Sequence, residues 1–402
     1  MKQNNQTNHQ NSNTQPKPAE QKTGAPFSAA ELWWTGAVFV ASSVGLALLL
    51  SNGFGATVTT ALALALAILS VVAQTRLIRS FAGTLGHFFL ILMLALFLGS
   101  PYLAGLFGAT VSACCSFCFF CRKGGGAYAP ALAILSYGLS AVILFDPLRA
   151  ALSLLSLPLA CALLLCLRGG VARIPAICRL TGTVLAVAIP AGALILRRHL
   201  GSLSAEAIRL FLDRVRLGAT DALTDALLST GSTLGLSVDA ASYAETMVTA
   251  LFNVLPALTV ILAMLLAYAV HSAALRCLIG QGEEKETVGK MLSFDMSLVS
   301  AILYFLALLL SFLLVGERTA LLGAVAQNVY LILVPGMLMT AWIAMNALLF
   351  ARAPSCLSTL IYLGVIFLIV NLPAIMLPIA SAFGAGVVIL GRIRLRLNQK
   401  NS

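Results

Sequence analysis

Residues 247–275, MVTALFNVLPALTVILAMLLAYAVHSAAL, contain no aspartate, glutamate, lysine or arginine. An apolar run of about 20 residues crosses a hydrocarbon core about 30 Å thick as one α-helix. Runs of the same kind recur from Trp33 to Leu390. The stretch therefore predicts a membrane-spanning helix, and its repetition predicts an all-α fold, a polytopic transmembrane helical bundle.

Composition agrees with a chain surrounded mostly by lipid. Of the 402 residues, 60% are hydrophobic and 10% are charged, whereas about 25% are charged in a soluble domain. The net charge is +11, but the lysines and arginines stand singly or in pairs between apolar runs instead of forming a basic face. We therefore expect the lipid bilayer as the principal partner and no nucleic acid.

We expect about 12 spans, within a range of 9–12. The expected spans are 33–50, 54–73, 82–98, 102–121, 127–145, 150–167, 180–196, 247–275, 297–315, 320–351, 357–370 and 374–390. The last two are either a tight hairpin or one broken helix, because Asn371, Pro373 and Pro378 interrupt the run.

Charge fixes the expected orientation. With the N-terminus inside, 18 of the 25 lysines and arginines fall on the cytoplasmic side, as the positive-inside rule requires. Both termini are therefore predicted to be cytoplasmic. The expected parts are a disordered tail (1–32), a membrane domain of about seven spans (33–196), an extracytoplasmic helical insertion (197–246), a membrane domain of about five spans (247–391) and a basic cytoplasmic tail (392–402).

The extracytoplasmic insertion has an amphipathic pattern. Ile208, Leu212 and Val215 recur at helical spacing. This candidate interaction helix lies on the membrane surface, caps a cavity or binds a partner protein. Further on, Ser242 and Glu245 have the spacing of a capping box, which predicts that the next helix begins near Tyr243.

Four cysteines crowd into CCSFCFFC, at positions 114, 115, 118 and 121. Two overlapping C-x-x-C spacings are typical of zinc or iron–sulfur ligands. Because a thiolate is costly in hydrocarbon, we favour the alternative that these cysteines pack as small apolar residues. We expect no metal and no cofactor.

Catalytic motifs are missing from the sequence: it has no H-E-x-x-H, no phosphate-binding lysine loop and no G-x-S-x-G elbow. No acidic residue lies well inside an expected span, which disfavours a proton or sodium relay. We therefore expect a protein that is not an enzyme, with no catalytic residue.

Uncharged polar residues remain inside the expected spans. Gln327, Asn328 and Tyr330 are close together, and Asn253 stands in the span of 247–275. These four residues are the candidate ligand pocket, and Pro335 offers a bend beside them. The alternative is that each one hydrogen-bonds a neighbouring helix.

Three stretches carry a family resemblance: NVLPALTVILAMLLAYAVHSAALRCLIG (253–280), QNVYLILVPGMLM (327–339) and AFGAGVVILGRIRLR (382–396). Over residues 205–397 the chain resembles the C-terminal half of the YybS-like bacterial membrane proteins. The N-terminal half of that family is thought to be similar to the substrate-binding components of energy-coupling-factor transporters. The resemblance implies a multi-pass protein of the bacterial cytoplasmic membrane.

Two functions follow from the sequence. The first is a non-enzymatic component that binds or transports a small molecule and takes its energy from a membrane or ATPase partner protein. The alternative is a membrane scaffold or regulator that holds another protein through the outer amphipathic helix or the cytoplasmic loop of residues 276–296.

Overall fold

The computed structural model describes residues 29–51, 55–78, 100–234, 239–280, 293–314, 320–352 and 371–400, with short pieces at 288–289, 291, 364–365 and 367–368. Secondary structure in these ranges is helical throughout. The predictions for residues 1–28, for span 82–98 and for most of 357–370 lie outside the described part. Residues 29–32 were predicted as tail but belong to the first helix.

The first half of the chain forms the following helices: α1 (Ala29–Leu50), α2 (Ala56–Ile78), α4 (Pro101–Arg122), α5 (Ala129–Leu144), α6 (Pro147–Ala150), α7 (Ser156–Arg168) and α8 (Arg173–Leu200). Short 3-10 turns, η1 (Gly125–Tyr128) and η2 (Ala151–Leu154), join some of them. The second half forms α9 (Ala205–Leu234), α10 (Ala240–Gly280), α12 (Leu298–Leu313), α13 (Ala320–Arg352) and α15 (Pro373–Lys400).

Nine helical stretches of the described residues are long and apolar enough to cross a membrane, and α12 is a shorter apolar helix. The chain is therefore a multi-pass membrane protein with an all-α fold. Nine such stretches lie within the predicted range of 9–12 spans. The expected span at 82–98 and most of that at 357–370 lie outside the described residues and do not enter this number.

Helix α4 lies at the centre of the N-terminal bundle, packed against α1, α2, α7 and α10. Small residues let its neighbours come close. A Cβ atom added to Gly105 would stand 2.6 Å from the Cα of Ala63 on α2. Phe39 of α1 packs on Phe117 of α4, with ring centroids 5.1 Å apart.

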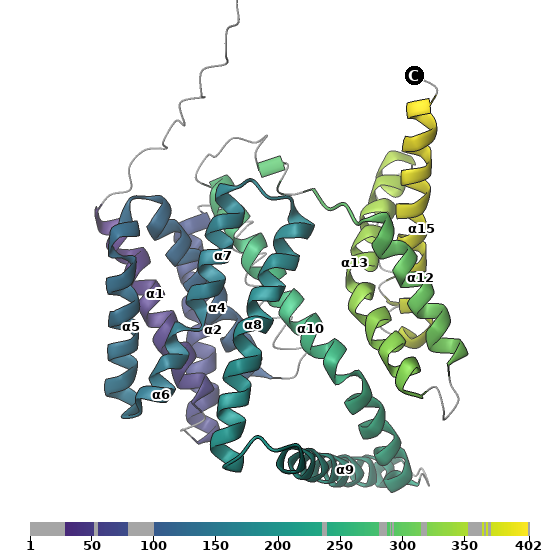
Figure 1. The fold of residues 1–402 in the computed structure, drawn as a ribbon, viewed down its shortest axis with the longest axis horizontal. Coiled ribbons are helices and arrows are strands. Elements are labelled where there is room, and N and C mark those ends of the chain that lie inside the picture. The colour runs from purple at the N-terminus through teal and green to yellow at the C-terminus, as the bar shows by residue number, and fades with distance from the viewer. Residues whose placement is uncertain are drawn as a thin grey trace, which may run out of the picture.

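Helices α12, α13 and α15 form a second unit, which stands beside the N-terminal bundle (Figure 1). Its core includes Tyr304, Tyr330 and Met337. Gly384 of α15 lies against the backbone of α13, so that an added Cβ would collide with the carbonyl oxygen of Met337. Close backbone approach at glycine is the usual way in which membrane helices associate.

Helix α10 joins the two units, since it packs against α8, α4 and α2 of the bundle and also against α13. It begins at Ala240, earlier than the predicted start near Tyr243. The capping-box prediction is wrong because the side chain of Asp239 accepts from the Ser242 backbone N–H at 3.2 Å, which satisfies that end of the helix one turn earlier.

Helix α9 lies across one end of the molecule, between the ends of α8 and α10 (Figure 1). Helices α1 and α15 begin and end, respectively, at the opposite end of the molecule. This arrangement agrees with termini on one side of the membrane and the insertion on the other. Helix α15 runs on to Lys400, so that residues 392–400, predicted as a tail, are helical.

Candidate functional site

The candidate site lies where α13 contacts the turn of α10 that contains Pro256. Pro256 stands inside α10 and has no N–H to donate. One residue later, the Ala257 N–H donates to Oδ1 of Asn328 at 2.8 Å. Nδ2 of Asn328 donates to the Asn253 carbonyl, also at 2.8 Å. A side-chain amide from α13 therefore bonds one donor and one acceptor of the α10 backbone, on either side of Pro256.

Asn328 is held in place from its own helix as well. Its Nδ2 donates to the carbonyl of Ala324, one turn earlier in α13, at 2.8 Å. The amide thus uses both of its donors and its acceptor on backbone groups. The structure brings together two residues of the predicted pocket, Asn253 and Asn328, although Asn253 takes part through its backbone.

The other two residues of the predicted pocket point elsewhere. Gln327 is exposed on α13. Tyr330 is buried against Tyr304 of α12, with ring centroids 5.4 Å apart. The Tyr304 hydroxyl shares a 2.6 Å hydrogen bond with Ser381 of α15. Tyr330 therefore belongs to the core of the second unit, and the interhelical bonding that was expected as the alternative is present for Asn328.

Sequence reasoning did not single out Pro256. It chose Pro335 as the bend near the polar residues, because Pro335 lies in the same span as Gln327 and Asn328. The signal that was available is Pro256 itself, since a proline inside a span has no N–H for the carbonyl one turn before it.

A second polar cluster, formed by Arg173, Tyr268, His271 and Ser272, joins the start of α8 to α10. Nη2 of Arg173 donates to Oγ of Ser272 at 2.9 Å, and the guanidinium lies 4.8 Å from the ring centroid of Tyr268. His271 is 1% exposed and Ser272 is 7% exposed. Sequence reasoning counted Arg173 only as a topology determinant.

The predicted interaction helix is α9. Ile208 is half-buried, whereas Leu212 and Val215 are each 42% exposed. Arg216 fastens α9 to α10 by donating to Oγ1 of Thr249 at 2.8 Å, and it lies 3.8 Å from a carboxylate oxygen of Glu245. Two of the three predicted contact residues therefore remain available to headgroups or to a protein.

Cys114, Cys115 and Cys118 are buried in the centre of the bundle. Their Sγ atoms lie against backbone carbonyls of neighbouring helices: Cys118 is 3.2 Å from the oxygen of Ala160 on α7, and Cys115 is 3.9 Å from that of Val270 on α10. Within the ranges that could be described, no group of three or more potential ligands could hold a metal ion. The contacts are those of small side chains that pack between helices.

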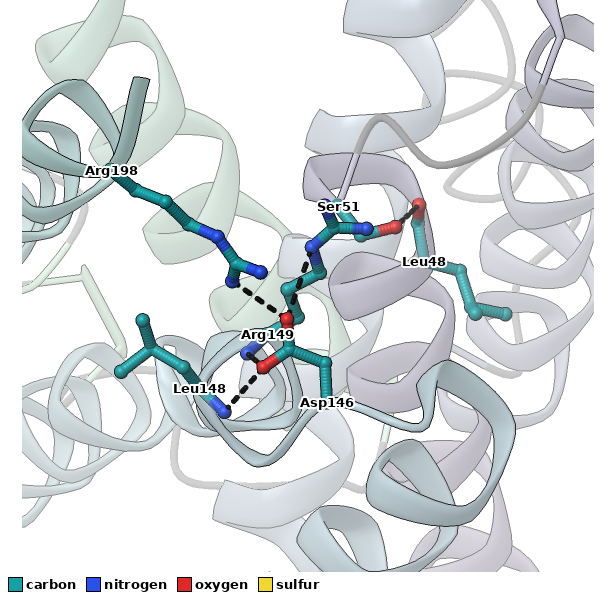
Figure 2. Close-up of polar contacts among 6 residues, drawn as sticks. All are labelled: Leu48, Ser51, Asp146, Leu148, Arg149 and Arg198. Carbon is teal, nitrogen blue, oxygen red and sulfur yellow. Dashed lines mark hydrogen bonds and ion pairs between the residues drawn. The ribbon is translucent and has the colours of Figure 1, made fainter. Parts of the chain in front are cut away.

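Between α5 and α6 the chain turns around Asp146 (Figure 2). One carboxylate oxygen accepts from the backbone N–H of Leu148 at 3.0 Å and of Arg149 at 3.3 Å, and the other accepts from Nη1 of Arg198 at 2.6 Å. The hydrogen bond from Arg198 lowers the pKa of Asp146, partial burial opposes it, and the two backbone N–H groups lower the pKa further. Asp146 thus ties the last turn of α8 to the α5–α6 corner.

Comparison with known proteins adds no family. No family model matches the chain, and neither a curated protein nor a solved structure matches it. The geometry of the two helical units, and of the polar groups between them, is what indicates a function.

Proposed function

We propose that this membrane protein is a non-enzymatic component that binds or transports a small molecule and obtains energy from an external partner, such as a membrane ATPase. The observation that carries the proposal is the proline-containing turn of α10, where the Ala257 N–H and the Asn253 carbonyl both bond the Asn328 amide of α13. Interrupted membrane helices commonly form the substrate sites of transporters, because their unpaired backbone groups can bind a ligand.

The position of this turn supports the proposal. Helix α10 contacts both helical units, and Asn328 is the polar link between α10 and the second unit. If α13 moved away from α10, the Ala257 N–H, the Asn253 carbonyl and the Asn328 amide would become free to bind a ligand with matching donors and acceptors. The resemblance to YybS-like proteins favours the same function in a bacterial cytoplasmic membrane.

The proposal is tested by purifying the chain from its native membrane in a mild detergent and identifying retained small molecules and proteins by mass spectrometry. A stoichiometric metabolite should accompany the wild-type protein and Gln327→Leu, and it should be lost from Asn328→Leu. Gln327 is the matched control because it is the exposed neighbour on the same helix. Wild-type protein that retains no small molecule, in native membrane or with added metabolite mixtures, would contradict the proposal.

A second function is favoured by the exposed apolar residues of α9. As a scaffold, the protein would bind another membrane protein through Ile208, Leu212 and Val215. Replacing these three by alanine should then release a copurifying protein without changing small-molecule retention, while Leu217→Ala on the same helix, 65% exposed, should leave the partner bound. Equal release by Leu217→Ala would point to general loss of apolar surface and would contradict a specific interface.

A further inference from the structure

We propose that Arg173, together with His271, forms a binding site for an oxyanion of the phosphate type at the junction of α8 and α10. The cation of Arg173 is held in a fixed position by Ser272 and by the ring of Tyr268. Two of its neighbours are more than nine-tenths buried: His271 is 1% exposed and Ser272 is 7% exposed. These contacts orient the guanidinium, and they do not neutralise it.

Two nitrogen atoms in this cluster are buried and have no hydrogen-bond partner. They are Nε of Arg173 and Nδ1 of His271. Nε always carries a hydrogen, and Nδ1 carries one in one of the two tautomers of neutral imidazole. An unsatisfied buried donor costs about 1–3 kcal/mol. Ser272, which accepts from Arg173, is the residue next to His271 in α10, so the two groups belong to one cluster.

Among the residues that the structure describes, none gives the site a negative charge of its own. No described carboxylate lies within ion-pair distance of Arg173, because those that pair do so elsewhere: Asp146 with Arg198, Glu245 with Arg216 and Asp295 with Arg392. Burial of an unpaired cation at the edge of a membrane is unfavourable. An oxyanion would supply both the counter-charge and the acceptor that the two free nitrogens need.

The start of α8 adds to the positive potential. Arg173 is the first residue of α8, and the preceding residue, Ala172, makes no side-chain cap. The positive end of the α8 dipole therefore lies beside the guanidinium and favours an anion, although Pro175 has no N–H to offer and the Ala176 N–H bonds the Ala172 carbonyl. The cluster lies near the end of α10 that the charge count places at the cytoplasmic surface, within reach of a phospholipid headgroup and of soluble phosphate.

The site does not rest on the function proposed above, because it shares no residue with the Asn328 turn. Its test uses the full chain in lipid nanodiscs. In the first arm, inorganic phosphate is titrated calorimetrically into nanodiscs of phosphatidylcholine. In the second arm, nanodiscs contain equal phosphatidylglycerol and phosphatidylcholine, and native mass spectrometry counts the lipids that stay bound. Binding only in the second arm identifies a lipid headgroup, and binding in the first identifies a soluble oxyanion.

We expect wild-type protein to bind in at least one arm. Arg173→Gln should weaken that binding about tenfold, which corresponds to about 1.4 kcal/mol, and His271→Ala should weaken it by a smaller factor. The matched control is Arg179→Gln, an exposed arginine on the same helix, which should leave binding unchanged. If Arg173→Gln does not fold, as judged by size-exclusion chromatography, binding by His271→Ala is compared with the wild type instead. That variant keeps the charge of Arg173.

Three results would overturn the proposal. The first is wild-type protein that binds in neither arm. The second is an equal loss of binding in Arg179→Gln, because the effect would then be general positive charge. The third is binding that appears only after Glu283, Glu284 and Glu286 are all changed to glutamine. Those carboxylates, which lie outside the described residues, would then be the natural partners of Arg173.

Discussion

At the scale of single residues, polar side chains bond backbone groups at a proline and at a helix start. Asn328 supplies an acceptor and a donor to the α10 backbone on either side of Pro256. Asp146 supplies acceptors where the chain leaves α5 and starts α6. Both residues satisfy backbone groups that would be costly to leave unpaired in or near lipid.

The Asn328 bridge predicts a specific energetic coupling. Asn328→Ala should lower the free energy of unfolding by about 1–2 kcal/mol, because the Ala257 N–H and the Asn253 carbonyl lose their partner. In a Pro256→Ala background the loss should be smaller, since an unbroken helix can pair those two groups itself. Unfolding in mixtures of mild detergent and SDS measures the free energy of unfolding of the wild type, the two single variants and the double variant. Equal losses in both backgrounds would show that the amide does not act through the proline.

Asp146 predicts an acid-dependent stability. Its pKa is lowered in the folded protein, so its contribution is fully present above the ordinary aspartate pKa of about 3.9 and is lost as the pH falls through the lower folded value. Thermal unfolding followed from pH 6 to pH 3 should therefore show a steeper acid decline for wild type than for Asp146→Asn. Asp213→Asn, an exposed aspartate of α9, serves as the control and should keep the wild-type profile.

At the scale of helices, the close approach of two helices depends on glycines at their contact. Gly105 lets α4 approach α2, and Gly384 lets α15 approach α13, in both cases with backbone atoms in the way of a Cβ. Gly386, two residues after Gly384, meets nothing within 4 Å. Two glycines of one helix therefore have different roles, which the sequence GAG does not reveal.

This difference predicts opposite effects of the same substitution. Gly384→Ala should destabilise the α13–α15 contact by about 1–3 kcal/mol, because the backbones must separate to admit a methyl group. Gly386→Ala should be neutral or slightly stabilising, since alanine has the higher helix propensity. Thermal unfolding in detergent, followed by circular dichroism, compares the two variants. A similar loss in both would show that the close approach at Gly384 is not what holds the helices together.

At the scale of the whole molecule, the sequence predicts the spans better than their contacts. Apolar length alone located α4, α10 and α13, because a bilayer demands uninterrupted runs of apolar residues. Apolar length could not predict the pairing of Asn328 with the turn at Pro256. Those residues are about 70 positions apart, and no local sequence pattern relates them. Arg173 was interpreted only by its position along the chain, because a charge count does not show which helix face a side chain occupies.

The predicted topology has a direct test. A green fluorescent protein fused after Ser402 should be fluorescent, because we expect the end of α15 in the cytoplasm. Alkaline phosphatase fused after residue 236, between α9 and α10, should be active, because we expect α9 on the outer side. Active phosphatase at the C-terminus would invert the orientation, and it would also move the Arg173 cluster to the outer surface.

The length of α10 has a consequence for the lipid around it. Its 41 residues correspond to about 60 Å of helix, which is about twice the thickness of the hydrocarbon core. The helix must therefore tilt or extend beyond the bilayer, and the height of α9 above the membrane then depends on how steeply α10 stands. We therefore expect α10 to tilt less in a bilayer with longer acyl chains and more in a thinner one, which would change the height of α9.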